Sequence, residues 1–401
     1  MNPLVATATS PDLGSIVLIL LASTLGALLS RVNRRVVLPT VILEIGLGIL
    51  IGPQVLDWAQ VDSYSQLLAD FGLSLLFFFA GLEVIKHRVP TKDLRRGTLG
   101  WALSLAIALG LCLVLQRAGL DAEWWLLAVA LATTSLGTLV PILSDAGVLR
   151  TPLGVAVLGT GVAGEFWPII VISVFITSTY GAAAEVALLI GFGALVMLAV
   201  GIALRARPPL ALRILRETLY TTGQVGVRAS LFLIAALVLV STDAGFDFVL
   251  GAFAAGLIIG LVLDSPTGEV VRLKLEGLGY GCFIPVYFVV TGMAFDLDSF
   301  LSAKGIGLAL LFLGLLFVIR GVPALLWRGG LRRSEVASLA LFGATGLPLI
   351  VAIVGIGVSE GAMSNAVGAS VIAAGMLSVL VFPVIGTRLA DRHAAAGGGS
   401  T

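Results

Sequence analysis

Residues 133–141 read Thr-Thr-Ser-Leu-Gly-Thr-Leu-Val-Pro, and residues 342–348 read Phe-Gly-Ala-Thr-Gly-Leu-Pro. Each stretch places hydroxyl side chains, glycine and proline in the middle of an apolar segment. Inside a membrane span, such residues favour a broken helix, whose unwound backbone and half-helix ends can coordinate an ion. A mere kink is the alternative, because glycine and proline are common in transmembrane helices. Each stretch is the fifth segment of its own half of the chain, and this symmetry favours two broken helices that cross at the midplane of a bilayer.

The composition places the chain in a membrane. Hydrophobic residues make up 58% of the 401 residues and charged residues 12%, and a soluble domain of this size cannot hide so much apolar surface. The net charge of +1 argues against nucleic acid as a partner. The two cysteines and two histidines form neither a metal-ligand pattern nor a nucleophile–base set. We therefore expect no enzyme, no cofactor and no resident metal.

The apolar segments predict an all-α polytopic protein with about 13 transmembrane helices of about 20 residues each. They follow an external segment at 1–13, occupy a transmembrane domain at 14–388 and precede a disordered tail at 389–401. Two halves, 14–180 and 224–388, flank a helix and linker at 184–222, which suggests inverted repeats. The spans are expected to begin near Gly14, Val36, Leu67, Thr98, Glu123, Leu153, Ala184, Gln224, Gly245, Tyr280, Gly305, Ser334 and Met363.

The distribution of basic residues predicts the orientation. With the N-terminus outside, the cytoplasmic loops and tail hold 20 of the 24 lysines and arginines, and the external loops hold only Arg117 and Lys304. Short cytoplasmic loops carry such an excess in membrane proteins. We therefore expect a multi-pass protein of the cell membrane with an external N-terminus and a cytoplasmic C-terminus.

Glu165 is the strongest candidate for an ion-binding group. It lies about 18 Å into the sixth span, near the middle of a core about 30 Å thick. Gly164 precedes it, and Pro168 removes the hydrogen bond that the Gly164 carbonyl would normally accept. A carboxylate beside a free carbonyl suits a hard monovalent cation. The alternative is a buried glutamate paired with a serine or arginine for structure alone.

Two further charged residues lie within apolar segments. Arg320 is inside the eleventh span, where a charge is costly and is rarely kept without a use. It is the obvious charge partner of Glu165, although it could instead extend towards the cytoplasmic interface. Glu44, in the second span, is an accessory candidate that could also serve helix packing. Glu83 is expected at the cytoplasmic interface, in contact with solvent.

Several of these segments together resemble the Kef-type membrane domain of the monovalent cation:proton antiporter-2 family, within the sodium/hydrogen exchanger superfamily. The resemblance covers residues 14–388. It is carried by residues 38–53, 71–83, 133–154 and 284–293, which are similar to the second, third, broken fifth and tenth helices of that family. The family usually has an aspartate in the sixth helix, preceded by Asp, Asn or Gln, and here Gly164 and Glu165 stand there. Arg320 matches the family's basic residue before the second broken helix.

The resemblance implies a homodimer, a six-helix core that carries the ion in each protomer, and alternating access. We therefore expect a secondary transporter that exchanges Na⁺ or K⁺ for H⁺, with Glu165 binding either ion. Further oxygen ligands are expected from Thr133, Thr134, Ser135, Thr345 and Gly346. A single titrating carboxylate would exchange the two ions one for one. Two alternatives remain, a symporter of the same fold for an organic anion and a non-transporting membrane sensor or scaffold.

Overall fold

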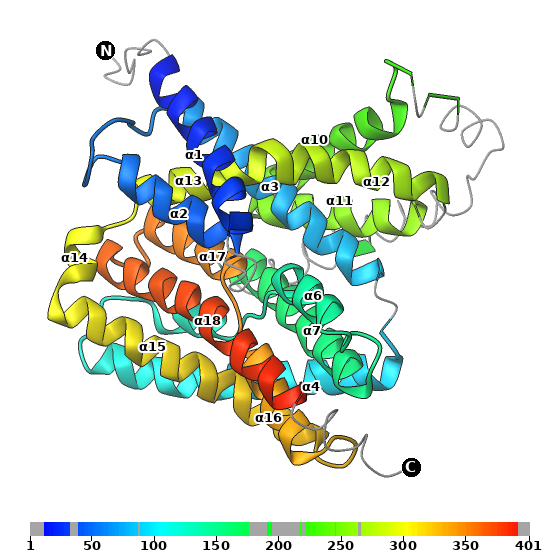
Figure 1. Ribbon diagram of the computed structural model, residues 1–401, viewed down its shortest axis with the longest axis vertical. Coiled ribbons are helices and arrows are strands. Elements are labelled where there is room, and N and C mark those ends of the chain that lie inside the picture. Colours follow the sequence, from blue (N-terminus) through cyan, green and yellow to red (C-terminus); the bar gives the residue numbers. More distant parts are fainter. Residues whose placement is uncertain are drawn as a thin grey trace. The chain divides into compact units, whose positions relative to one another are not determined.

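The structure is a computed structural model that describes residues 12–32, 39–86, 89–175, 221–244, 246–263 and 266–391, with short pieces at 191, 193–194 and 217–218. The described residues are helical and contain no strand (Figure 1). The first part of the chain forms α1 (Leu13–Val32), α2 (Thr40–Ile51), α3 (Ser63–Lys86), α4 (Thr91–Arg117), α5 (Trp124–Leu131), α6 (Leu136–Asp145) and α7 (Pro152–Phe175). The remainder forms α10 (Val225–Asp243), α11 (Phe248–Val262), α12 (Pro266–Leu278), η1 (Gly279–Phe283), α13 (Ile284–Met293), α14 (Leu297–Leu301), α15 (Ala303–Gly321), η2 (Val322–Trp327), α16 (Arg333–Gly343), α17 (Pro348–Ser359) and α18 (Asn365–Asp391).

Most of the predicted spans coincide with apolar helices. Within the described residues, nine segments are long and apolar enough to cross a membrane, and three shorter apolar helices lie at Thr40–Ile51, Trp124–Val140 and Phe248–Val262. The predicted seventh span and the linker to residue 222 fall almost entirely outside the described residues. The total of 13 spans therefore stays a prediction, whereas the all-helical membrane architecture is confirmed.

Two predicted boundaries are wrong. The tenth span was placed near Tyr280, but an apolar helical segment already begins at Gly268 and runs to Met293. The charged residues of α12 do not interrupt the helix, because Glu269 and Arg272 pair with each other at 2.7 Å along one helix face, and such i,i+3 pairs are compatible with a helix. The tail was predicted to be disordered from residue 389, but α18 continues to Asp391.

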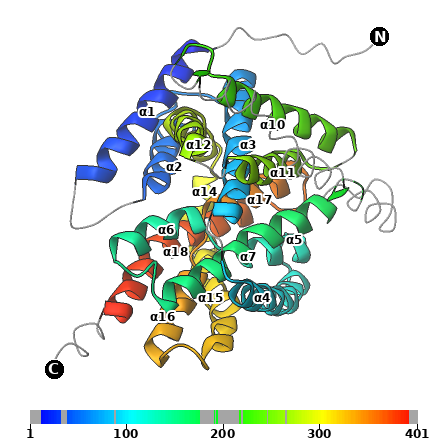
Figure 2. The same ribbon diagram turned by 90° about the vertical axis from the view of Figure 1, so that its right-hand side faces the viewer.

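The chain forms two compact units that each draw on both halves of the sequence. The smaller unit holds Met1–Leu73 and Gly277–Asp298, and the larger holds Ser74–Glu276 and Ser299–Thr401. In the smaller unit α2 packs against α1 and α13. In the larger unit α7 packs against α4, while α18 packs against both α15 and α16 (Figures 1 and 2).

Glycines set the close packing between α2 and α13. A Cβ on Gly48 would stand 2.1 Å from the carbonyl oxygen of Val289, and a Cβ on Gly292 would stand 2.2 Å from the carbonyl oxygen of Ile45. The two backbones therefore touch, which is how small residues hold helices together in lipid, where apolar side chains gain nothing by leaving the solvent.

This packing predicts different effects for two glycines of α2. We expect Gly48→Val to lower the apparent melting temperature of the purified protein, because overpacking of this kind costs about 1–3 kcal/mol or more. Gly46→Val is the matched control, since a Cβ there meets nothing within 4 Å and the change in helix propensity is the same. Equal melting temperatures for the two variants in detergent would contradict the packing described here.

Candidate functional site

Two broken helices meet inside the larger unit. Residues 132–135 separate α5 from α6, and residues 344–347 separate α16 from α17. The backbone N–H of Ser135 donates to the carbonyl oxygen of Thr345 at 2.9 Å, so one break is bonded directly to the other. Pro348 opens α17 at a position where its missing N–H leaves no bond unmade. The predicted pair of broken helices is confirmed, and the alternative of simple kinks is wrong.

Thr134 links four elements at this crossing. Its backbone N–H donates to the carbonyl oxygen of Gly164 at 3.2 Å, and its hydroxyl donates to the carbonyl oxygen of Gly343 at 2.6 Å. The same hydroxyl oxygen accepts from Arg320, at 3.0 Å from Nε and 2.6 Å from Nη2. Thr134 therefore ties the first break to α7, α15 and the end of α16.

Arg320 is buried, with 2% of its surface exposed, so the interpretation that it reaches towards the interface is wrong. Besides Thr134, its guanidinium donates from Nη1 to Ser104 Oγ of α4 at 3.0 Å. It also donates to the carbonyl oxygens of Thr160 and Gly343, at 3.3 Å and 3.2 Å. Gly343 is the last residue of α16, so the positive charge lies at the negative end of that half-helix.

Glu165 lies at the N-terminus of a half-helix, whereas Arg320 lies at a C-terminus. Its side chain is 8% exposed, and its Oε1 accepts from the backbone N–H of Leu136, the first residue of α6, at 2.5 Å. The backbone of Gly137 also hydrogen-bonds to the carboxylate. The N-terminus of a helix carries a partial positive charge and unpaired N–H groups that favour an anion. In the alternative interpretation, Glu165 pairs with a serine or arginine. In the structure its carboxylate is bonded to the backbone of α6 instead.

The expected ion pair between Glu165 and Arg320 is not formed. The hydrogen bonds of Arg320 to described residues all end on hydroxyl or carbonyl oxygens. The two charges instead neutralise the ends of different half-helices. The charge-partner role predicted for Arg320 is therefore corrected to one of holding the crossing together.

Gly164 provides the space for this arrangement. A Cβ there would stand 2.8 Å from Arg320 Nη2 and 2.8 Å from the Thr134 side chain. Its carbonyl oxygen, predicted to be freed by Pro168, does not remain unbonded, because it accepts from Thr134. An ion could reach this oxygen only through its remaining lone pair.

Glu83 of α3 is the site residue that sequence reasoning missed. A Cβ on Gly137 would stand 3.8 Å from Glu83 Oε1, so this carboxylate also lies near the N-terminus of α6, and it interacts electrostatically with Glu165. It is partly buried rather than solvated. Its position near the end of an apolar helix indicated a residue at the interface. It belongs to the site because the start of α6, which is distant in sequence, lies beside it.

The other predicted ligands lie along the two breaks. Thr133 and Thr345 donate their hydroxyls to carbonyl oxygens of their own helices, at 2.8 Å and 3.1 Å, which leaves oxygen lone pairs for a ligand. Ser135 Oγ lies 2.9 Å from the hydroxyl of Thr138. All three are buried.

The second break is held by a serine that the sequence did not single out. The backbone N–H of Gly346 donates to Ser378 Oγ at 3.2 Å, and Ser378 Oγ is also 3.2 Å from the Gly346 carbonyl oxygen. Gly346 is therefore engaged by α18 at both backbone groups. Glu44 belongs to the smaller unit, where its Cγ would lie 3.1 Å from a Cβ on Gly26 of α1.

The chain is similar to known proteins along most of its length. A family model described as "Sodium/hydrogen exchanger, transmembrane" matches residues 17–392. The Putative Na(+)/H(+) antiporter YjbQ of Bacillus subtilis is 26% identical over 404 residues, which cover 95% of this chain. The Probable Na(+)/H(+) antiporter 3 of Methanocaldococcus jannaschii is 30% identical over 271 residues, which cover 66% of this chain. The chain spans 64% and 68% of the lengths of these two relatives.

A solved structure shares the fold. The sodium proton antiporter MjNhaP1 from Methanocaldococcus jannaschii at pH 8 matches with a TM-score of 0.67 and 19% identity, over 96% of this chain and 99% of that chain.

The crossing predicts that the Thr134 hydroxyl matters more than its methyl group. We expect Thr134→Val to lower the free energy of unfolding by about 1–3 kcal/mol, because it removes the hydroxyl oxygen that accepts from both Nε and Nη2 of the buried Arg320 guanidinium. Thr134→Ser keeps the hydroxyl and should remain near the unsubstituted protein. Apparent melting temperatures in detergent measure both, and a Val variant as stable as the Ser variant would show that this bond contributes little.

Proposed function

The chain belongs to the sodium/hydrogen exchanger family, and we propose that it exchanges Na⁺ or K⁺ for protons across a membrane, with Glu165 binding either ion in turn. Membership is confirmed at the level of the superfamily, and the Kef type of membrane domain remains part of the proposal. The observation that carries the proposal is the buried carboxylate of Glu165 at the start of α6, where the two broken helices cross.

The surroundings of Glu165 suit competition between a proton and a cation. Its carboxylate is held by neutral backbone N–H groups, so no arginine or lysine must leave before a cation binds. Burial penalises the bare negative charge, and either a proton or a cation relieves that penalty. The same oxygen atoms serve both ligands, which makes the two occupancies mutually exclusive and couples their movements.

Glu83 adds a second carboxylate to the proposed site. Two carboxylates and nearby hydroxyl oxygens provide the hard oxygen ligands that alkali cations require. The two carboxylates differ in exposure: Glu165 is buried, whereas Glu83 is only partly buried. We assign the exchanged proton to Glu165 and a constant negative charge to Glu83, which attracts the cation.

Arg320 acts in this proposal as a positioning residue. Its bonds to α4, α7, α16 and the first break fix the backbone against which Glu165 is placed. Transport of an organic anion is disfavoured, because such a substrate would have to displace the oxygens that already receive the Arg320 N–H groups. A homodimer with an external N-terminus and a cytoplasmic C-terminus completes the proposal.

The proposed exchange depends on the carboxylate of Glu165. We expect Glu165→Gln to abolish cation-dependent proton flux in reconstituted vesicles while the protein stays folded, because a neutral amide neither titrates nor attracts a cation. Glu360→Gln is the matched control, since Glu360 is exposed at the end of α17. Flux should be tested with Na⁺, K⁺ and Li⁺ in turn. Rates in the Glu165 variant equal to those of the control would remove Glu165 from the mechanism.

The proposed site also predicts whether the exchange carries net charge across the membrane. Gly164 offers no carboxylate, and arginine does not release a proton in a protein, so one-for-one exchange depends on Glu83 staying ionised. We expect the reversal point of proton flux, in vesicles clamped at different membrane potentials under a fixed cation gradient, not to move with voltage. Glu83→Gln should keep this voltage independence and weaken apparent cation affinity about tenfold, the effect of losing about 1.4 kcal/mol. A voltage-dependent reversal point would instead show that the exchange carries net charge.

A further inference from the structure

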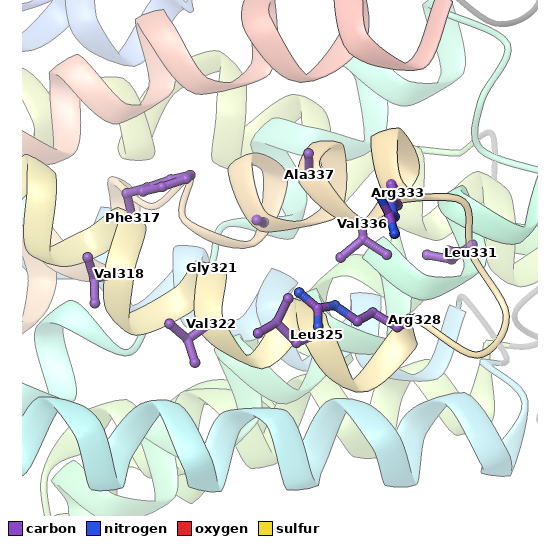
Figure 3. Close-up of a pocket in the computed structure, with 11 residues that line it drawn as sticks. Phe317, Val318, Gly321, Val322, Leu325, Arg328, Leu331, Arg333, Val336 and Ala337 are labelled. Carbon is purple, nitrogen blue, oxygen red and sulfur yellow. The ribbon is translucent and has the colours of Figure 1, made fainter.

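An open groove lies between α15 with η2 on one side and α16 on the other. It has a volume of about 710 Å³ (Figure 3). Its walls are mostly apolar and include Phe317, Val322, Leu325 and Ala337. Phe317, Val322 and Leu325 are 43%, 39% and 45% exposed, and they belong to the candidate membrane span Ala303–Trp327.

Charge is confined to one end of the groove. Figure 3 shows Phe317 and Val318 at one end, and Arg328 and Arg333 at the other. Both arginines are exposed. Among the residues that the structure describes, neither forms an ion pair. The nearby carboxylate of Glu335 caps its own helix by accepting from the backbone N–H of Arg332 at 2.8 Å.

The length of the apolar wall matches one leaflet of a bilayer. Four residues of α15 and the six residues of η2 lie between Phe317 and Arg328, so the two residues are about 16–20 Å apart along the helix at 1.5 to 2.0 Å per residue. Half of the hydrocarbon core is about 15 Å thick. If Phe317 is at the centre of the bilayer, Arg328 is at the level of the headgroups and the apolar wall runs beside an acyl chain.

We propose that this groove binds an anionic phospholipid, with the phosphate between Arg328 and Arg333 and an acyl chain along the wall of α15 and η2. Arginine pairs well with phosphate oxygens, and basic pockets between helices on the cytoplasmic side suit acidic headgroups. A zwitterionic lipid would meet the same apolar wall but would gain less from the two arginines. The groove also reaches Gly321, so the lipid would lie one residue from Arg320.

The experiment measures retention of lipid by the purified, delipidated full chain. Native mass spectrometry would follow binding of phosphatidylglycerol, with phosphatidylcholine and soluble glycerol phosphate as separate probes. Arg328→Gln/Arg333→Gln removes the charges. Ala337→Trp and Val322→Trp each fill the groove from one wall, so the failure of one variant to fold leaves the other. Arg150→Gln/Arg388→Gln is the matched control, because both residues are exposed, lie on the predicted cytoplasmic side and do not line the groove.

We expect phosphatidylglycerol to bind the unsubstituted chain and the control variant alike. The groove charge variant should bind it roughly thirtyfold more weakly, from about 1 kcal/mol for each basic residue near a lipid surface. The Ala337→Trp and Val322→Trp variants should also lose binding of phosphatidylglycerol. Equal binding of phosphatidylcholine, an equal loss in the control variant, or full binding of glycerol phosphate alone would overturn the proposal. Dissociation of a dimer by the filling variants, with lipid retention unchanged, would assign the groove to a second copy of the chain and overturn it too.

Discussion

The structure of the larger unit depends on how two interrupted helices satisfy their backbone groups away from water. Each break leaves carbonyl and N–H groups that lipid cannot satisfy, and each such group costs several kcal/mol if left unpaired. The carbonyl of Gly343 accepts from both Thr134 and Arg320, and Ser135 bonds across to Thr345. Each break therefore satisfies part of the other, while Gly164 of α7 and Ser378 of α18 satisfy further groups.

Opposite charges are placed at opposite helix ends, and this placement explains why they do not pair. The guanidinium of Arg320 meets the negative end of α16, while the carboxylate of Glu165 meets the positive end of α6. A direct ion pair would leave both half-helix ends uncompensated within the membrane. It would also neutralise the carboxylate permanently, whereas backbone N–H donors leave its negative charge available to a ligand.

The breaks and the central carboxylate could be predicted from the sequence because their signals are local. Hydroxyls with glycine and proline interrupt an apolar run, and Glu165 stands near the centre of another. The partners of Arg320 could not be predicted. Thr134 and Gly343 stand in the two interrupted stretches, but no local pattern connects them with Arg320, and Ser104 lies in a third distant segment with no pattern that singles it out. Glu83 was misplaced for a related reason, because distance along α3 measures depth in the membrane but not what packs beside it.

Gly164 and Glu83 together explain how the site holds two carboxylates although the residue before Glu165 in α7 is a glycine and not an acidic residue. A Cβ at position 164 would stand 2.8 Å from both Arg320 Nη2 and the Thr134 side chain, so a larger residue there would require the groups that hold the crossing to shift. The second carboxylate reaches the start of α6 from α3 instead, beside Gly137, which has no side chain to block it. The fixed positive charge and the second negative charge thus come from different helices, and the protonation that we propose for Glu165 would leave unbroken the bonds that hold the two broken helices together.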